Sequence, residues 1–107
     1  MISGAADPAR AARALASVKD RLVDRTHGVV KLLAPPFDRT PHEPGYTKGY
    51  VPGVRENGGQ CTHAAAWVVL AETMLGRRDT AGDLLRLINP VHITATSDGL
   101  ARCRVEP

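Results

Sequence analysis

The sequence predicts a mainly α-helical chain, with about three helices and one long ordered loop. Two observations lead to this prediction. Apolar residues recur at helical spacing in three separate stretches, and each stretch is bounded by a capping residue, a glycine or a proline. Between the first and second stretches, prolines and glycines recur so often over residues 34–60 that a continuous helix is excluded there.

The first helix is predicted to run from Pro8 to about Asp24. Asp7 is a suitable N-cap, and a proline at the first helical position is preorganised for a helix. The apolar residues of this stretch lie at helical spacing: Ala11, Leu15, Val18 and Leu22. Gly28 can take the left-handed conformation that closes a helix, so the helix is expected to end near it.

The long loop follows a short extended segment predicted at residues 29–33, which are apolar and β-branched at their start. A connection as long as residues 34–60 is unusual in a compact domain unless it is functional or disordered. Its composition favours order, because apolar and aromatic anchors are spaced along it: Phe37, Tyr46, Tyr50, Val51 and Val54.

The second helix is predicted from about Thr62 to Leu75, with Gly76 as its closing glycine. The apolar stripe from Trp67 to Met74 is expected to belong to the core. Because alanines fill much of the apolar content of the chain, this core should bury little area per residue.

The third helix is predicted from Thr80 to about Ile88, with Asp79 as its N-cap. The Asn89-Pro90 pair should stop it, since proline cannot continue a helix. No clear period is visible in residues 91–107. Three alanine-rich helices around a long loop would make a thin core, so the chain is not expected to be a complete folding unit.

Composition limits the classes of function. The chain has 107 residues, which allows one domain at most, and a net charge of +3. Its basic residues are scattered, and aromatic residues make up only 4%, so nucleic-acid binding is not expected. No signal segment and no apolar run of the roughly 20 residues that a membrane span needs is visible, which predicts a soluble, cytoplasmic chain without a membrane segment. A larger parent protein could still be bound to a membrane.

Cysteines and histidines do not form a recognisable metal or catalytic pattern. Cys61 and Cys103 are expected to be free thiols. The spacing of the four histidines is not that of zinc ligands, so no metal and no cofactor are expected: His27, His42, His63 and His92. Cys61 and His63 would point about 200° apart on a helix, which argues against a nucleophile–base pair.

One polar stretch contains the best candidates for a ligand site. Residues 45–67 read GYTKGYVPGVRENGGQCTHAAAW and end in the second predicted helix. Within nine positions this stretch holds six hydrogen-bonding side chains: Arg55, Glu56, Asn57, Gln60, Thr62 and His63. So many donors and acceptors, carried by a glycine-rich backbone to the start of a helix, favour a site for a polar ligand.

His63 lies in the first turn of the predicted helix, where free amides and the helix dipole attract anions. It could therefore donate to a phosphate or sulfate, or it could hydrogen-bond the loop. Glu56 could accept hydrogen bonds from sugar hydroxyls, or it could pair with Arg55. Asn57 and Gln60 offer donors and acceptors that suit polyols, but both residue types also fix loops.

The polar stretch closely resembles glycoside hydrolase family 94, the inverting sugar phosphorylases. Further segments resemble the cyclic β-1,2-glucan synthase branch of that family: LLAPPFDRTPHEPGYTKGY, LINPVH and the closing RVEP. The likeness covers nearly the whole chain from about Ala9. It implies that residues 1–107 form part of a catalytic domain whose fold is an (α/α)6 barrel several times longer than this chain.

The resemblance also implies a chemistry and roles for individual residues. In this family inorganic phosphate attacks the anomeric carbon of a β-glucoside while an aspartic acid protonates the leaving oxygen. His63 matches the phosphate-binding histidine, and Glu56 matches the acidic residue that holds the acceptor-side sugar. Arg55, Asn57 and Gln60 belong to the same motif and are expected to line the sugar site. Phosphate would be the co-substrate, and a β-glucan oligosaccharide the other ligand.

The sequence also departs from the family pattern. Nothing in the chain matches the general acid, which lies upstream in the family, and Asp38 does not match it. Cysteines stand at 61 and 103 where tyrosine is usual, and Thr47 stands where an aliphatic residue is usual. We therefore expect no catalytic residue in this chain and no activity on its own.

Three readings of the chain follow. It could be one wall of a phosphorylase site that associates with the remainder of a split barrel. It could be a carbohydrate- or anion-binding module without catalysis. It could also be a non-functional gene remnant.

Overall fold

The computed structural model describes residues 2–102, and most of their regular structure is helical. The mainly α class is thus confirmed. The elements follow in this order: α1 (Pro8–Arg21), β1 (Val23–Asp24), β2 (Val29–Val30), the 3-10 helix η1 (Gly45–Gly49), α2 (Thr62–Met74), α3 (Arg78–Ile88), α4 (Pro90–Ile93) and α5 (Ser97–Arg102).

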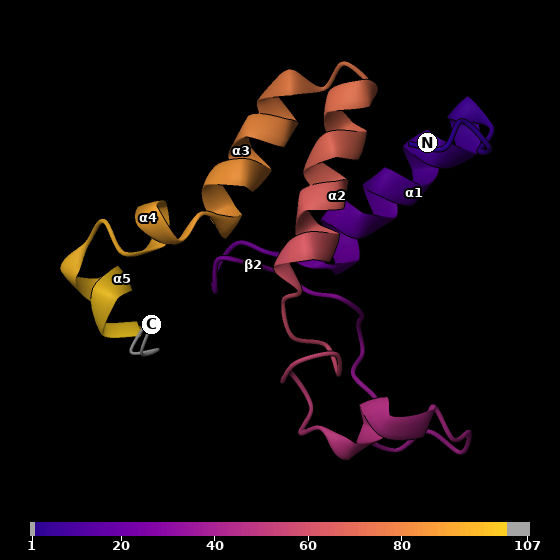
Figure 1. Cartoon of the computed structure of the whole chain (residues 1–107), viewed down its shortest axis with the longest axis vertical. Coiled ribbons are helices and arrows are strands. Elements are labelled where there is room, and N and C mark those ends of the chain that lie inside the picture. Colours follow the sequence, from indigo (N-terminus) through magenta and orange to yellow (C-terminus); the bar gives the residue numbers. More distant parts are fainter. Residues whose placement is uncertain (1, 103–107) are drawn as a thin grey trace.

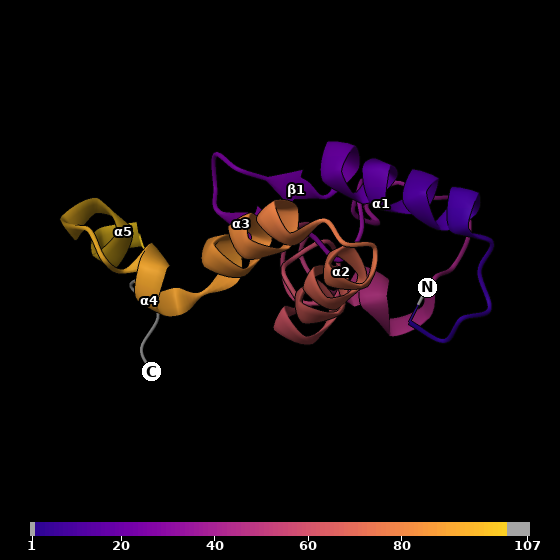
Figure 2. The ribbon, with the colours of Figure 1, turned by 90° about the horizontal axis from the view of Figure 1, so that it is seen from above.

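The helices form a small layered group from which the loop and the C-terminal helices project. Helices α2 and α3 lie side by side, and the loop that carries η1 descends below them (Figure 1). Helix α1 lies in a second layer, while α4 and α5 extend away from both layers (Figure 2). The radius of gyration is 15.2 Å, whereas a compact chain of this length has about 13 Å. The arrangement is therefore open and extended.

Helix α1 begins as the sequence predicts. The Asp7 carboxylate accepts a hydrogen bond from the Arg10 N–H at 2.9 Å, which caps the helix. The helix ends at Arg21 instead of Asp24, because the next residues pair with β2 as an antiparallel hairpin. Gly28 has the left-handed φ of 70° that was expected, but it closes the hairpin turn instead of the helix.

The extended segment predicted at residues 29–33 is confirmed for residues 29–31, while residues 32 and 33 lie in a bend, and the structure adds the partners of the extended part. Val30 pairs with Val23 in the hairpin, and Lys31 forms an isolated antiparallel bridge with Gln60. The hairpin therefore connects α1 to the end of the long loop. Short sequence runs contain no information about which distant backbone they pair with, so this pairing was not predicted.

The core is small and lies where α2 and α3 cover the hairpin. Its buried cluster is Val30, Ala65, Leu84 and Ile88. Partly buried aliphatic side chains surround it: Val23, Val68, Val69 and Leu87. Two of the four buried side chains come from α3 and only one, an alanine, from α2. The thin core expected from the alanine content is present.

The prediction that the stripe from Trp67 to Met74 is core was wrong for this chain. Trp67, Leu70 and Met74 are 46%, 43% and 54% exposed. Helix α2 instead buries the face that contains Ala65 and Ala71. Apolar residues occur nearly all the way round this helix, so its period alone did not select the side that faces α3.

Glu72 is a buried acid that the sequence did not point to. It lies on the inner face of α2 and is only 2% exposed. Its Oε2 lies 3.5 Å from Nη1 of Arg77, in the turn between α2 and α3. The ion pair compensates in part for removing the carboxylate from water, and it joins the end of α2 to the start of the next helix.

The third helix and the tail differ from the prediction. Helix α3 starts at Arg78, so Asp79 lies in its first turn and Arg77 is the N-cap. Asn89 and Pro90 end α3 as expected, but the Asn89 side chain then accepts a hydrogen bond from the Val91 N–H at 2.9 Å and caps α4. The described residues therefore contain five α-helices instead of about three. Cys103 lies outside the described residues.

The hairpin should contribute to stability in a pH-dependent way. Oδ2 of Asp24 lies 2.9 Å from Lys31 Nζ and 3.0 Å from His27 Nδ1. Lys31 first, and then His27, hold the pKa of this carboxyl well below its usual range. The resulting stabilisation is fully present above the ordinary aspartate pKa of about 3.9 and is lost as the pH falls below it towards the depressed value.

We therefore expect Asp24→Asn to have a lower urea midpoint of unfolding than wild type at pH 6. The difference between the two midpoints should shrink as the pH falls from about 5 to about 2. Circular dichroism at each pH measures this difference. The matched control is Asp20→Asn on the exposed side of α1, which should keep a midpoint close to wild type. A difference that stays constant over this range would contradict the assignment.

Candidate functional site

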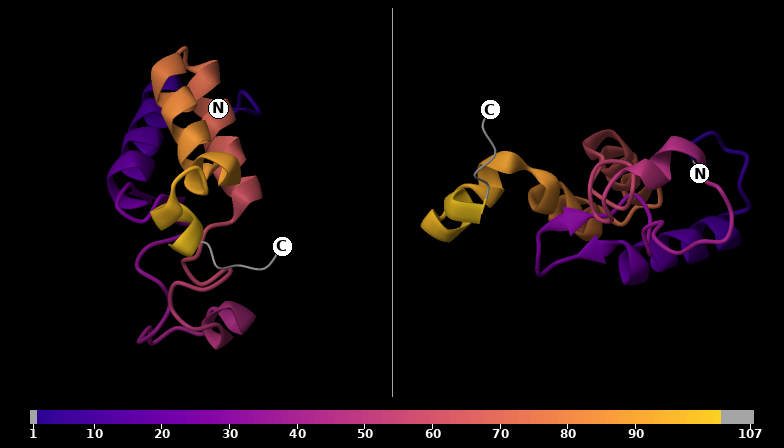
Figure 3. Two further views of the ribbon diagram at one scale, coloured as in Figure 1. Left: turned by 90° about the vertical axis from the view of Figure 1, so that its left-hand side faces the viewer. Right: turned by 90° about the horizontal axis from the view of Figure 1, so that it is seen from below.

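The long loop leaves and re-enters the helical group through a narrow neck. The Leu32 N–H donates to the Gly59 carbonyl at 2.9 Å, next to the bridge between Lys31 and Gln60. Below this neck the chain runs outwards to η1 and returns, as the side views show (Figure 3). The two ends of the loop are thus held together, and the returning end leads directly into α2.

The buried side chain of Asn57 stabilises the loop by hydrogen bonds to its backbone. It has no exposed surface, and its side-chain amide makes three hydrogen bonds to backbone. Oδ1 accepts from the Phe37 N–H at 2.7 Å, while Nδ2 donates to the carbonyls of Phe37 and Tyr50, both at 2.8 Å. One side chain thereby joins three separate segments of the loop.

Gln60 fixes the returning end of the loop. Its Oε1 accepts a hydrogen bond from the Val30 N–H at 2.8 Å, which ties the loop to strand β2. Asn57 and Gln60 were expected to line a sugar site. The buried Asn57 presents no atom to solvent, whereas Gln60 is only half-buried and uses its Oε1 to bind the hairpin. Both side chains therefore fix the loop, and sugar binding by either of them stays a prediction.

Arg55 and Glu56 form the tip of a tight turn. The turn is closed by the Asn57 N–H, which donates to the Val54 carbonyl at 3.0 Å. Arg55 has a φ of 49°, which is uncommon for a residue with a side chain, and its guanidinium lies 5.0 Å from the ring centroid of Tyr50. Such backbone strain persists only where the surrounding contacts impose it, and it is frequent at functional sites.

The Glu56 carboxylate has an unused acceptor. Its Oε2 is buried and has no hydrogen-bond partner among the described residues. Arg55 Nε lies 3.7 Å away, within range of charge attraction but too far for a hydrogen bond. The side chain as a whole is 42% exposed. A ligand would therefore reach Glu56 through the exposed part of its side chain and not through Oε2, while Arg55 remains beside it.

Gly59 is required by the shape of the turn. A Cβ at this position would lie 2.7 Å from the Arg55 carbonyl oxygen and 2.9 Å from the Arg55 nitrogen. Both are backbone atoms in the turn, so neither can move aside easily. Gly58 has a φ of 92°, which only glycine adopts readily.

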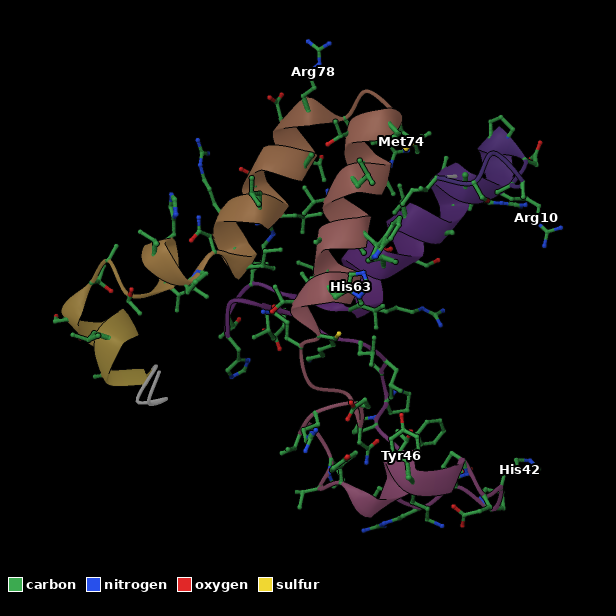
Figure 4. The ribbon with its side chains drawn as sticks, in the orientation of Figure 1. Arg10, His42, Tyr46, His63, Met74 and Arg78 are labelled. Carbon is green, nitrogen blue, oxygen red and sulfur yellow. The ribbon has the colours of Figure 1, made fainter. Side chains whose placement is uncertain are left out.

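His63 is at the start of α2, immediately after the loop (Figure 4). The N-cap is Cys61, and no side chain among the described residues caps the helix here. The amides of the first turn consequently remain available to an anion. The His63 ring is exposed, and its Nε2 accepts a hydrogen bond of 2.6 Å from Nε1 of Trp67. This spacing of four residues could have suggested the contact.

The structure joins some of the candidate residues and leaves others apart. Arg55 and Glu56 are neighbours in one turn, and Asn57 and Gln60 hold the backbone behind them. Among residues 2–102, no hydrogen bond or ion pair connects His63 to Arg55 or Glu56. Within this range, the Arg55–Glu56 turn and His63 are connected only through the backbone that runs from the turn past the loop neck into α2.

Among the described residues, cavities are also found away from Arg55, Glu56 and His63. One of about 370 Å³ lies between the hairpin turn and the region of α3 and α4, and one of about 510 Å³ is formed by residues 35–40. Within residues 2–102, no group of three potential metal-binding side chains is found. No helix in the described part of the chain has the length and apolar character to cross a membrane.

The polar stretch thus contains an exposed histidine at an uncapped helix start and, separately, a strained Arg-Glu turn. A family model described as "Glycosyl hydrolase 94 superfamily, catalytic domain" matches residues 1–107. The chain belongs to this family. The resemblance expected from the polar stretch is thereby confirmed over the whole chain.

Individual relatives agree with the family match. Cyclic beta-(1,2)-glucan synthase NdvB of Rhizobium meliloti (strain 1021) is 45% identical over 106 residues, which cover 99% of this chain and 4% of that protein. Solabiose phosphorylase of Paenibacillus borealis is 32% identical over 98 residues, covering 92% of this chain and 12% of that protein. N,N'-diacetylchitobiose phosphorylase of Vibrio proteolyticus is 33% identical over 90 residues, covering 84% and 11%. The chain thus spans a small part of each relative.

The close packing around Gly59 leads to a direct test of the loop. We expect Gly59→Ala to destabilise the loop by about 1–3 kcal/mol, because its methyl group would overlap the Arg55 backbone. Hydrogen exchange of the Gly53 N–H, which donates to the Asn57 carbonyl at 2.8 Å, reports on the opening of this turn.

The matched control is Gly49→Ala at the end of η1, where a Cβ would meet no heavy atom within 4 Å. This variant should exchange like wild type. Equal protection of the Gly53 amide in both variants would show that the turn is not held as described.

Proposed function

We propose that this chain supplies one wall of the phosphate and sugar site of an inverting β-glucoside phosphorylase domain. The observation that carries the proposal is the start of α2, where His63 is exposed and no side chain among the described residues caps the first-turn amides. Two relatives are named phosphorylases, enzymes that use phosphate as the attacking group. A helix start with a histidine donor suits that anion.

In this proposal His63 and the first-turn amides of α2 bind inorganic phosphate, the co-substrate. Glu56 accepts hydroxyl hydrogen bonds from the acceptor-side sugar, and Arg55 stays beside it as a positive charge and donor. Support comes from the partial exposure of the Glu56 side chain and from the strained backbone of Arg55. Asn57 and Gln60 act behind these residues by fixing the loop that presents them.

The resemblance assigns the general acid to a stretch upstream of the matched segment, and no residue here takes that role. Phosphorolysis needs a positioned phosphate and an acid in the same site. We therefore propose that the chain acts together with the remainder of an (α/α)6 barrel. The exposed apolar side chains on α2, Trp67, Leu70 and Met74, support such an association. A cytoplasmic location is also part of the proposal.

Phosphate binding tests the assignment of His63. Isothermal titration calorimetry with inorganic phosphate should show binding to the wild-type chain and a loss of about tenfold or more in His63→Ala, the effect of one hydrogen bond to a charged group. The matched control is His42→Ala, an exposed histidine at the far side of the loop, which should bind as wild type (Figure 4).

Equal phosphate binding by His63→Ala and wild type would overturn the His63 assignment. The same titration with a short β-1,2-glucan tests the sugar side. Glu56→Gln should weaken that binding, and it should leave phosphate binding close to wild type. Loss of both ligands in Glu56→Gln would indicate a disrupted loop and not a sugar contact.

The isolated chain should not catalyse phosphorolysis. Incubation with a β-glucan and phosphate should release no glucose 1-phosphate above the background of the His63→Ala variant, because the proton donor for the leaving group is missing. Release that depends on His63 would show that the chain holds an acid of its own.

A further inference from the structure

Trp67 donates a hydrogen bond to the imidazole of His63, and this bond selects which ring nitrogen carries the proton. The indole Nε1–H can only donate a hydrogen bond, and it lies 2.6 Å from Nε2 of His63. Nε2 must therefore be the acceptor. In a neutral imidazole one nitrogen accepts and the other carries the proton, so the proton of His63 is on Nδ1.

We propose that Trp67 is a positioning residue that fixes the tautomer and orientation of His63, so that Nδ1–H is the donor offered to a bound phosphate. The inference rests on the proposed function of His63 as a phosphate ligand. It gives Trp67 a role beyond packing, and it specifies which atom of the imidazole faces the anion.

The rings of Trp67 and His63 pack against each other, and Nδ1 of His63 is left without a partner among the described residues. Trp67 is one helical turn after His63, and the two ring centroids are 5.8 Å apart with the planes tilted by 50°. The imidazole is therefore held against a larger ring within the same helix. In the part of the chain that the structure describes, we find no hydrogen-bond partner for Nδ1 of His63, so this nitrogen is free to bind a ligand.

Trp67 lies outside the small core of this chain, on the face of α2 that we propose to meet the remainder of the barrel. Its side chain lies on the outer face of α2 and is 46% exposed, away from the core cluster of Ala65 and Leu84. A tryptophan at this position adds little to the small core of this chain. What it does supply is a fixed N–H donor next to the histidine.

Long-range proton–nitrogen NMR on the full ¹⁵N-labelled chain reads the tautomer directly. The neutral His63 ring of the wild type should show a protonated Nδ1 and an unprotonated Nε2, with His63→Ala identifying the signals. Trp67→Phe keeps an aromatic ring and removes the donor. In this variant His63 should populate both tautomers, since nothing then selects between the two nitrogens. Leu70→Ala, on the same exposed face, is the control and should keep the wild-type pattern.

Titration with inorganic phosphate completes the test. Trp67→Phe should weaken phosphate binding by about two- to tenfold, the effect of losing one neutral hydrogen bond. The double variant Trp67→Phe/His63→Ala should bind no more weakly than His63→Ala alone, because Trp67 acts only through the imidazole. An additional loss in the double variant would show that Trp67 acts by another route and would overturn the proposal.

The outcomes separate this inference from the function on which it rests. If the wild type binds phosphate through His63 but has its proton on Nε2, or if Trp67→Phe changes neither tautomer nor affinity, the role of Trp67 is overturned and the phosphate site stands. If the wild type has the Nδ1–H tautomer but does not respond to phosphate, the phosphate site is wrong, and the positioning role fails with it.

Discussion

The three hydrogen bonds of the Asn57 amide are the constraint on which the candidate site depends. They join the backbone at Phe37 and Tyr50 to the turn that carries Arg55 and Glu56. Because the Asn57 side chain is fully buried, loss of these bonds would leave its amide without partners and without access to water. The loop can therefore be long and rich in glycine and still hold one conformation.

The same loop places the start of α2. Gln60 binds the Val30 backbone, and Leu32 binds Gly59, so the neck of the loop is attached to the hairpin on which the helices pack. The uncapped first turn of α2 and His63 follow at once. A small core can thus position the polar stretch, because hydrogen bonds attach the loop to the hairpin in addition to the apolar contacts of the core.

The sequence predicted much of this arrangement, and its errors have physical causes. The start of α1 and the closing glycine of α2 followed from local signals, Asp7 with Pro8 and Gly76, whose geometry depends only on neighbouring residues. Helices α4 and α5 were missed because each has six residues or fewer, too short for a visible period. The exposed face of α2 was misassigned because apolar residues surround that helix.

By itself, the sequence determined the mainly helical class, the ordered loop and the family, and it named candidate site residues, because caps, glycines and a specific motif are local properties of the chain. Only the tertiary structure decided which of these residues face solvent. It buried Asn57, directed Gln60 to the hairpin, left an oxygen of Glu56 without a partner and brought Trp67 onto His63. These outcomes depend on contacts between distant backbone segments and on side-chain directions, which spacing along the chain does not specify.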